Sequence, residues 1–183
     1  MTSGAPAFDL RPEPYDGPAG AQLVADLAAD LGRRYDDEAP ASARSPEEQA
    51  ARQAELDADE AAYLAEVTPG DVAPPVGAFV VARLDGEPVG CGALRRHADG
   101  VAEVKRLWVA PPARGRGLAR TLMAWLEAEA VALGYRQLTL ETGLRQPEAI
   151  ALYTALGYRR RAPYGRYADS PLSVCFERDL PVR

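Results

Sequence analysis

The stretch that decides the fold is EVKRLWVAPPARGRGLAR, residues 103–120, together with the segment that follows it to Leu133. Val104 to Val109 mixes β-branched, aromatic and charged residues, a composition typical of a strand. The two prolines of Ala110 to Ala113 can continue neither a strand nor a helix. From Gly117 onward apolar residues recur at helical spacing, and Gly134 supplies a C-terminal stop. The stretch therefore predicts a strand, a tight turn, a glycine-rich loop and a helix.

The glycine-rich loop is predicted to bind an anion. It leaves unpaired N–H groups at a helix N-terminus, where the helix dipole favours negative charge. Gly115 and Gly117 let a phosphate approach the backbone, and Arg114, Arg116 and Arg120 supply positive charge. A P-loop is excluded because no Lys-Ser or Lys-Thr pair follows the glycines, and the dinucleotide fingerprint fails because Arg120 occupies its third glycine position.

What remains is the pattern Arg-x-x-Gly-x-Ala from Arg114 to Ala119, placed after a strand that begins with a carboxylate. This pattern resembles the pyrophosphate-binding signature of the GNAT N-acyltransferase superfamily. The resemblance implies acetyl-CoA (coenzyme A) as the cofactor, with its pantetheine arm added as an extra strand beside the backbone of the Glu103 strand. The residues it implies for cofactor binding are Leu107, Trp108, Val109, Arg114, Gly115, Arg116, Gly117, Leu118, Ala119, Arg120 and Gln146.

Length and composition limit the class of protein. We expect residues 1–183 to form one domain, with residues 1–6 flexible. Hydrophobic content of 47% and charged content of 26% are typical of a soluble globular protein, and the sequence predicts neither a membrane span nor a signal peptide. Two separated cysteines and one histidine favour a cytoplasmic protein with no metal site.

The net charge of −6 is unevenly distributed along the chain. Residues 1–94 carry 18 acids and 6 bases, whereas residues 95–183 carry 9 acids and 15 bases. Such asymmetry indicates a basic region that faces a polyanion. The basic residues are not interleaved with aromatic stacking residues, so a small polyphosphate such as coenzyme A fits better than nucleic acid. The sequence leaves the oligomeric state open, with a homodimer as one option.

Periodicity and turn signals predict an α/β (α+β) chain. Ser45-Pro46-Glu47-Glu48 is a capping box that opens a helix to about Val67, and Asp85-Gly86 is a two-residue hairpin turn. The order matches the GNAT fold from end to end, which implies a mixed, mostly antiparallel sheet with a splayed parallel pair of strands and flanking helices. The expected strands are 8–11, 78–84, 88–95, 103–109, 137–141, 158–162 and 172–180, and the expected helices begin at Pro18, Ser45, Gly117 and Pro147.

Two carboxylates are candidates for the general base. The place of Glu103 on its strand, eleven residues before Arg114, matches the catalytic glutamate of GNAT histone acetyltransferases. Its alternative role is a structural pair with Lys105 or Arg106. Glu141, at the end of the neighbouring strand, is the competing candidate, and a water chain is a third option.

Tyr153 is the candidate general acid. It lies in QPEAIALYTALGY, residues 146–158, which looks like the second GNAT motif, whose tyrosine customarily protonates the leaving thiolate. A phenol of pKa near 10 beside a thiol of pKa near 8.5 keeps its proton, so it can donate but not act as a base. The alternative is a buried core tyrosine.

The remaining chemistry-bearing residues receive structural interpretations. Cys91 and Cys175 are expected to be small core residues, and His97 has no acidic partner in register. The arginine runs at 95–96 and 159–161 are either solvated faces or a site for a carboxylate on the acceptor. Loops 36–45 and 164–171 are expected to border the acceptor site.

These features predict an N-acetyltransferase that transfers an acetyl group from acetyl-CoA to a primary amine of a small molecule, by direct attack in a ternary complex. The alternative is a module that binds acyl-CoA as a sensor or scaffold without turnover. Glu103, Glu141 and Tyr153 together favour the enzyme, because a sensor needs none of them.

Overall fold

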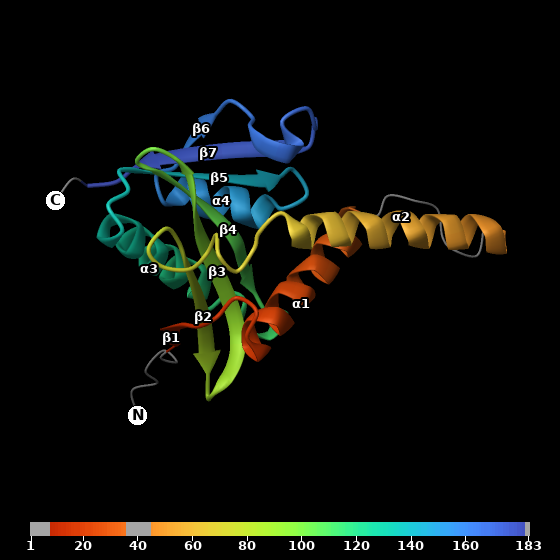
Figure 1. Ribbon diagram of the computed structural model, residues 1–183, viewed down its shortest axis with the longest axis horizontal. Helices are drawn as coiled ribbons and strands as arrows, with labels where there is room; N and C mark the ends of the chain where they lie inside the picture. The colour runs from red at the N-terminus through yellow and green to blue at the C-terminus, as the bar shows by residue number, and fades with distance from the viewer. Residues whose placement is uncertain (1–7, 36–44, 182–183) are drawn as a thin grey trace.

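A computed structural model describes residues 8–35 and 45–181 of the chain (Figure 1). The expectations for residues 1–6 and for nearly all of loop 36–45 lie outside these described ranges. The described strands are β1 Asp9–Pro12, β2 Ala78–Leu84, β3 Glu87–Ala98, β4 Val101–Val109, β5 Gln137–Gly143, β6 Arg159–Arg161 and β7 Ser173–Asp179. The described α-helices are α1 Pro18–Tyr35, α2 Pro46–Ala65, α3 Leu118–Ala132 and α4 Pro147–Ala155.

The strands form one mixed sheet in the order β1-β2-β3-β4-β5-β7-β6. Within the described residues β4 and β5 are the one parallel pair, connected through α3, and every other neighbouring pair is antiparallel. The β4–β5 ladder runs only from Val101↔Gln137 to Val104↔Leu140. Both strands continue beyond that point without pairing to each other, so the expected fold with its splayed parallel pair is confirmed.

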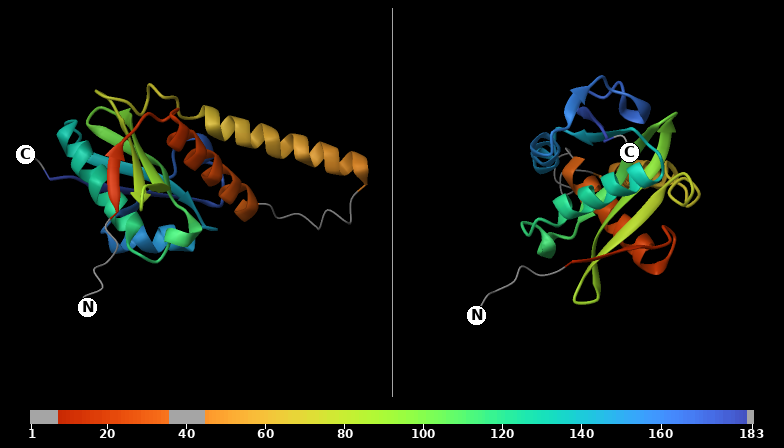
Figure 2. Two further views of the ribbon diagram at one scale, coloured as in Figure 1. Left: turned by 90° about the horizontal axis from the view of Figure 1, so that it is seen from below. Right: turned by 90° about the vertical axis from the view of Figure 1, so that its left-hand side faces the viewer.

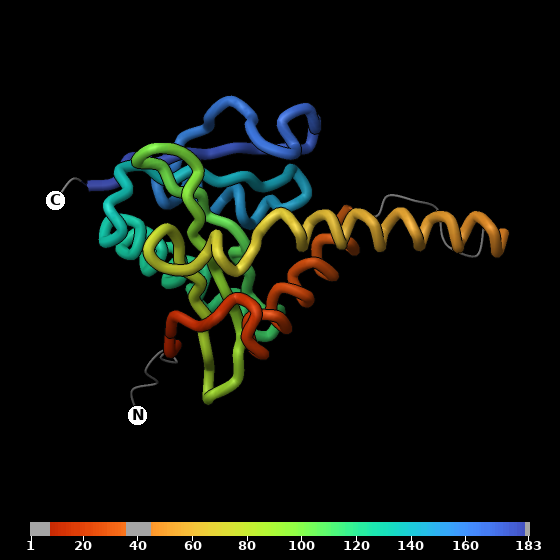
Figure 3. The backbone as a smooth tube through the Cα atoms, viewed as in Figure 1, coloured from red at the N-terminus to blue at the C-terminus, as the bar shows by residue number. Residues whose placement is uncertain are grey.

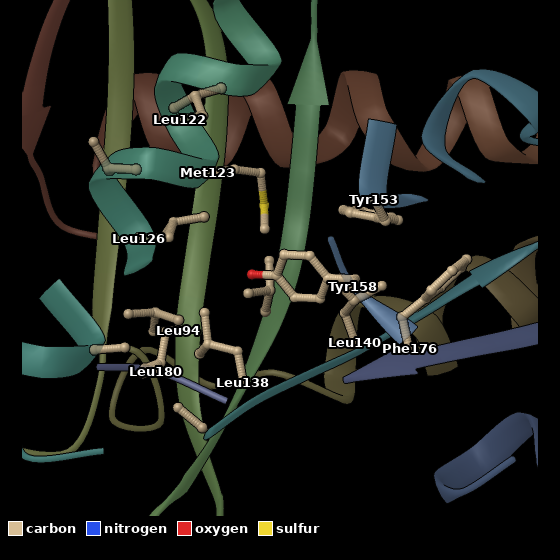
Figure 4. Packing of buried hydrophobic residues seen from close by; sticks show 14 of the residues in the cluster. Leu94, Leu122, Met123, Leu126, Leu138, Leu140, Tyr153, Tyr158, Phe176 and Leu180 are labelled. Atoms are coloured by element: carbon tan, nitrogen blue, oxygen red, sulfur yellow. The ribbon is translucent and has the colours of Figure 1, made fainter. Parts of the chain in front are cut away.

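Hydrophobic side chains pack on both faces of the sheet, because successive residues of a strand point to opposite sides. On one face, α3 and α4 cover a cluster that includes Leu122, Met123, Leu126 and Phe176 (Figure 4). On the other face, α1 packs Leu23, Val24 and Leu27 against Val81 and Trp108. The sheet therefore separates two hydrophobic clusters, one on each of its faces.

Local sequence signals account for most element boundaries. Asp85 and Gly86 have φ values of 52° and 88° and form the expected turn, which lies at the tip of the projecting β2–β3 hairpin in Figure 3. The β3–β4 hairpin is longer than expected, since β3 continues through His97 to Ala98. The His97 ring packs edge-on against Tyr164, with ring centroids 4.8 Å apart, and this contact supports the longer strand.

Helix α2 projects from the body of the molecule beside α1 (Figure 2, left). Its capping box is present: the Ser45 side chain accepts from the Glu48 N–H, and the Glu48 side chain accepts from the Ser45 N–H. No α2 residue is buried, as its thin apolar face predicts. No helix in the described parts of the chain combines the length and apolarity needed to cross a membrane.

Candidate active site

A β-bulge in β4 opens the sheet at the site. Ala93 pairs with Lys105 and Cys91 pairs with Trp108, so one residue of β3 lies opposite two residues of β4. Arg106, one of those two, has φ 56°, and its carbonyl accepts a hydrogen bond from the Cys91 thiol at 3.2 Å. A bulge bends its strand and increases the local twist. The bend takes the last residues of β4 away from β5 and leaves their backbone edge facing a cavity.

The first cavity, of about 430 Å³, lies between the diverging ends of β4 and β5. The loop before α3 and the first turn of α3 form its outer end, and α4 and α1 form its sides. All but one of the residues that the sequence implies for cofactor binding line it; Arg116 does not. Those residues are Leu107, Trp108, Val109, Arg114, Gly115, Gly117, Leu118, Ala119, Arg120 and Gln146.

The glycine loop has the geometry of an anion site. Gly115 and Gly117 have φ values of 76° and 83°, in the left-handed region that side chains avoid. Gly117 is the N-cap of α3, and its carbonyl accepts from the Arg120 N–H at 3.0 Å. The N–H groups of Leu118 and Ala119, ahead of that bond, have no intrahelical acceptor. They lie at the wall of the first cavity, where an anion can reach them.

Asp30 of α1 organises the outer end of this cavity, and the sequence did not single it out. Its Oδ2 accepts from Arg114 at 2.9 Å and from the Trp108 indole N–H at 3.3 Å. Burial opposes the charge of Asp30, but these two hydrogen bonds and the nearby Arg34 outweigh it and lower the pKa of the carboxyl group. In the sequence, the local feature that could have drawn attention to Asp30 is its i,i+4 spacing from Arg34, which allows an ion pair on one face of α1.

Glu141 lies at the inner end of the first cavity, near the end of β5. The Ser173 hydroxyl donates a hydrogen bond to its Oε1 at 3.1 Å. Burial raises the pKa of Glu141 to about 7, against the lowering effect of Lys105. A carboxyl group with this pKa is ionised in part of the molecules near neutral pH, which suits a general base.

Glu103 has a different environment. Its side chain is 2% exposed and lines neither of the two cavities of the site. Arg95 donates to its Oε2 at 2.7 Å, and the Tyr164 hydroxyl donates to its Oε1 at 3.1 Å. Arg95 also bonds Glu66, so its guanidinium belongs to an internal network rather than to a solvated face.

Tyr153 of α4 lines the first cavity and is 5% exposed. Figure 4 shows it among the buried hydrophobic residues, near Tyr158 and Phe176. Its ring packs against Tyr158 and Phe176, with centroid separations of 5.9 and 5.7 Å. Burial, reinforced by the charge of Glu141, raises the pKa of the Tyr153 phenol well above its ordinary value. The hydroxyl therefore stays protonated and is available as a hydrogen donor. Core packing and access to the cavity coexist at this residue.

A second cavity, of about 540 Å³, adjoins the first. Its walls are α1, the inward side of α2, the end of β5 and the segment before β7, which includes Arg166, Tyr167 and Ser170 from loop 164–171. Four residues line both cavities: Leu31, Tyr63, Glu141 and Gln146. These four residues form the junction, and the Gln146 amide donates to the Tyr35 hydroxyl at 3.3 Å beside it.

The other residues considered from sequence lie outside the junction. Cys91 and Cys175 are buried free thiols, as expected, and burial raises the pKa of Cys91 to about 12. Arg159 pairs with Glu177 and Asp179 on the far strands of the sheet.

The first cavity has the geometry of an anion site at one end, and it contacts the Glu141 carboxyl group and the protonated Tyr153 phenol. Groups of these types are the ones that acyl transfer uses. The fold and the site together define an acyltransferase. The family model described as "Acetyltransferase (GNAT) family" matches residues 35–158. The chain belongs to this family.

Similar proteins agree with this assignment. The chain is 46% identical over 103 residues to an IAA acetyltransferase of Azospirillum brasilense, a match that covers 56% of this chain and 67% of that protein. A solved Klebsiella pneumoniae structure, assigned to the acyl-CoA N-acyltransferases, has a TM-score of 0.70 and 28% identity over 95% of this chain and 98% of its own. A GNAT family acetyltransferase of Elizabethkingia anophelis with acetyl-CoA bound shares the fold, with a TM-score of 0.61, 18% identity and coverage of 94% and 98%. Matches to the Azospirillum protein and two further curated relatives span 52–67% of those relatives' length.

Proposed function

We propose that this protein is an acetyl-CoA-dependent N-acetyltransferase that acts on a primary amine of a small molecule by direct attack in a ternary complex. The observation that carries the proposal is the junction of two cavities at Glu141. The first cavity has the features of a site for the acetyl donor. The second cavity, walled in part by the exposed helix α2, is the proposed site for the amine acceptor. A reaction between two bound molecules requires such a meeting point.

The residues of the first cavity fit acetyl-CoA. The backbone of Leu107 to Val109 is not paired with β5 and suits an added strand, and the N–H groups after Gly117 suit a pyrophosphate. The Val109 carbonyl accepts from Arg114 Nε at 2.9 Å, a contact that an added strand would have to share or replace. A Cβ placed on Gly115 or Gly117 would project into open space, so nothing in the protein occupies the concave side of this loop. When bound, acetyl-CoA supplies an activated acetyl group on a thiolate leaving group.

The protein's own residues divide the proton transfers. The Glu141 carboxylate removes a proton from the acceptor ammonium, because its pKa of about 7 leaves it ionised at and above neutral pH. The raised pKa keeps the Tyr153 Oη protonated until the leaving thiolate departs, and the hydroxyl would then donate that proton to the thiolate. In this proposal Glu103 serves to hold Arg95 and Tyr164 in place, since both of its oxygens already have partners.

The proposal is tested by mixing the protein with acetyl-CoA and a panel of primary amines, and by measuring release of free CoA. Calorimetry on the same preparation measures CoA binding separately. We expect binding of CoA and release that depends on an amine. Binding without release from any amine would leave a CoA-binding module and refute the enzyme.

A further inference from the structure

The second cavity carries information on the acceptor, and the inference rests on the proposed function. Its neck is the junction with Glu141 and Tyr63, and its body is lined by apolar side chains of three different segments. Leu31 comes from α1, Leu56 from α2 and Leu172 from the turn directly before β7. An acceptor that reaches Glu141 through this cavity must pass along an apolar wall, so its middle portion is hydrocarbon rather than polar.

Several of the partly buried side chains of helix α2 line this cavity. Arg52, Leu56 and Tyr63 are shielded from solvent and line the cavity, whereas most of the helix is exposed. They are spaced as one face of a helix. The inward face of α2 therefore points mainly at a cavity instead of the core, and the acceptor lies along this face.

The arginines of the second cavity already have acidic partners. Arg33 contacts Asp30 at 3.4 Å, Arg52 contacts Glu55 at 3.2 Å, and Arg166 contacts Asp59 at 4.0 Å. The charges of Arg52 and Arg166 are offset by acids of their own. Arg33 shares Asp30 with Arg34 and Arg114, but its side chain is 68% exposed, so water screens its charge.

Two carboxylates that line the same cavity, unlike its arginines, have no partner of opposite charge among the described residues. Asp57 accepts a hydrogen bond from the neutral Gln53 amide at 2.7 Å, and within the described residues neither Asp57 nor Glu60 has a cationic partner. Both lie on α2 on the outer side of Tyr63. At about 1.5 Å rise per residue, Glu60 lies about 4.5 Å and Asp57 about 9 Å from Tyr63 along the helix axis. The cavity thus offers unneutralised negative charge one to two helical turns beyond its neck.

We propose that the acceptor is an elongated aliphatic amine with a second cationic group, such as an α,ω-diamine. One amino group reaches Glu141, the methylene chain lies along Leu31, Leu56 and Leu172, and the distal ammonium faces Glu60 and Asp57. At Glu141 the acceptor ammonium gives one proton to the carboxylate, and the neutral nitrogen would form the new N–C bond as the C–S bond to the thiolate leaving group breaks. The departing thiolate would take the proton of the Tyr153 hydroxyl, and the second proton that the nitrogen loses would restore that hydroxyl. The distal ammonium keeps its charge and takes no part in the transfer.

Acceptors of equal length test this assignment. Hexylamine, 1,6-diaminohexane and 6-aminohexanoate present the same reactive amine with an apolar, a cationic and an anionic far end. Their kcat/KM values are measured from CoA release at saturating acetyl-CoA. We expect the diamine to exceed hexylamine by about two- to fivefold for each exposed carboxylate it meets, and the amino acid to be the poorest of the three.

Charge-removing variants locate the effect. Glu60→Gln, alone and combined with Asp57→Asn, should lower the ratio of the diamine kcat/KM to the hexylamine kcat/KM toward one. Glu47→Gln removes the same charge from the exposed first turn of α2, away from the cavity, and should leave the preference intact. Equal values for all three acceptors, or a preference for 6-aminohexanoate, would overturn this inference while amine-dependent CoA release still upheld the acetyltransferase. Release from none of the three acceptors, nor from any amine of the wider panel, would overturn the proposed function itself.

Discussion

Replacing Glu141 with Gln should stabilise the protein and at the same time inactivate it. Burial moves the pKa of this carboxyl group from 4.5 to about 7. The native state therefore binds its proton more tightly than the unfolded state does, and ionising the group costs stability. That cost is absent below about pH 4.5, grows as the pH rises toward 7 and is complete above it. A displacement of this size corresponds to about 3 kcal/mol.

The neutral Gln side chain avoids the cost and keeps an oxygen that can accept from Ser173. From the two pKa values, the advantage of Glu141→Gln should grow from about 1 kcal/mol at pH 5.5 to about 3 kcal/mol at pH 8.5. Urea unfolding of both proteins at these two pH values measures it. Both values lie above the isoelectric point of about 4.9, so the protein keeps a net negative charge.

Activity should move in the opposite direction. Loss of a general base lowers turnover by about 10²–10⁴-fold, and part of the loss should return as the pH rises toward the pKa of the acceptor amine. Glu103→Gln is the matched control, since it makes the same chemical change at a carboxylate that holds Arg95 at 2.7 Å. Weakening a buried pair is destabilising, so this variant should lose at least about 1 kcal/mol at both pH values. A Glu141→Gln protein that is less stable than wild type at pH 8.5, or that retains full turnover, would refute the assignment of Glu141.

Three further predictions concern the acid, the loop and α2. Tyr153→Phe should keep the fold and the acetyl-CoA affinity but lose about 10²–10⁴-fold in turnover, with no recovery at high pH; full activity would leave this residue a core role only. Gly117→Glu, which places a side chain and a negative charge at φ 83° on the loop, should weaken CoA binding at least about tenfold in calorimetry, and unchanged affinity would remove the loop from the site. Ser45→Ala should cost α2 about 1 kcal/mol through its capping box and raise the KM for the acceptor more than that for acetyl-CoA; equal changes in both would contradict an acceptor role for α2.

The conformation of the loop before α3 was predictable from the sequence because its determinants are local. Gly115 and Gly117 report the backbone conformation of their own loop, and the prolines of η2 (Pro111–Ala113) end β4 directly before it. The hairpin turn at Asp85-Gly86 and the capping box at Ser45 are likewise determined by a few adjacent residues. Such signals are legible without knowledge of the tertiary structure.

The choice between Glu103 and Glu141 could not be made from the sequence. Both carboxylates lie on neighbouring strands, and only distant residues distinguish them. Arg95 and Tyr164 engage Glu103, whereas Glu141 meets Ser173 and two cavities. The bulge at Arg106 was also not predicted, although Gly92 stands opposite it, and a glycine inside a strand often marks such a feature.

The bulge also explains how the two halves of the site are held in register. Arg106 donates from Nη2 to the Tyr63 carbonyl at 2.6 Å, and its guanidinium lies 3.8 Å from the centroid of the Tyr63 ring. Next to this contact, Lys105 of β4 and Arg95 of β3 both bond Glu66, the C-cap residue of α2. The edge of β4 that faces the first cavity and the helix that walls the second cavity are therefore held together at Arg106, the residue where the strand bends.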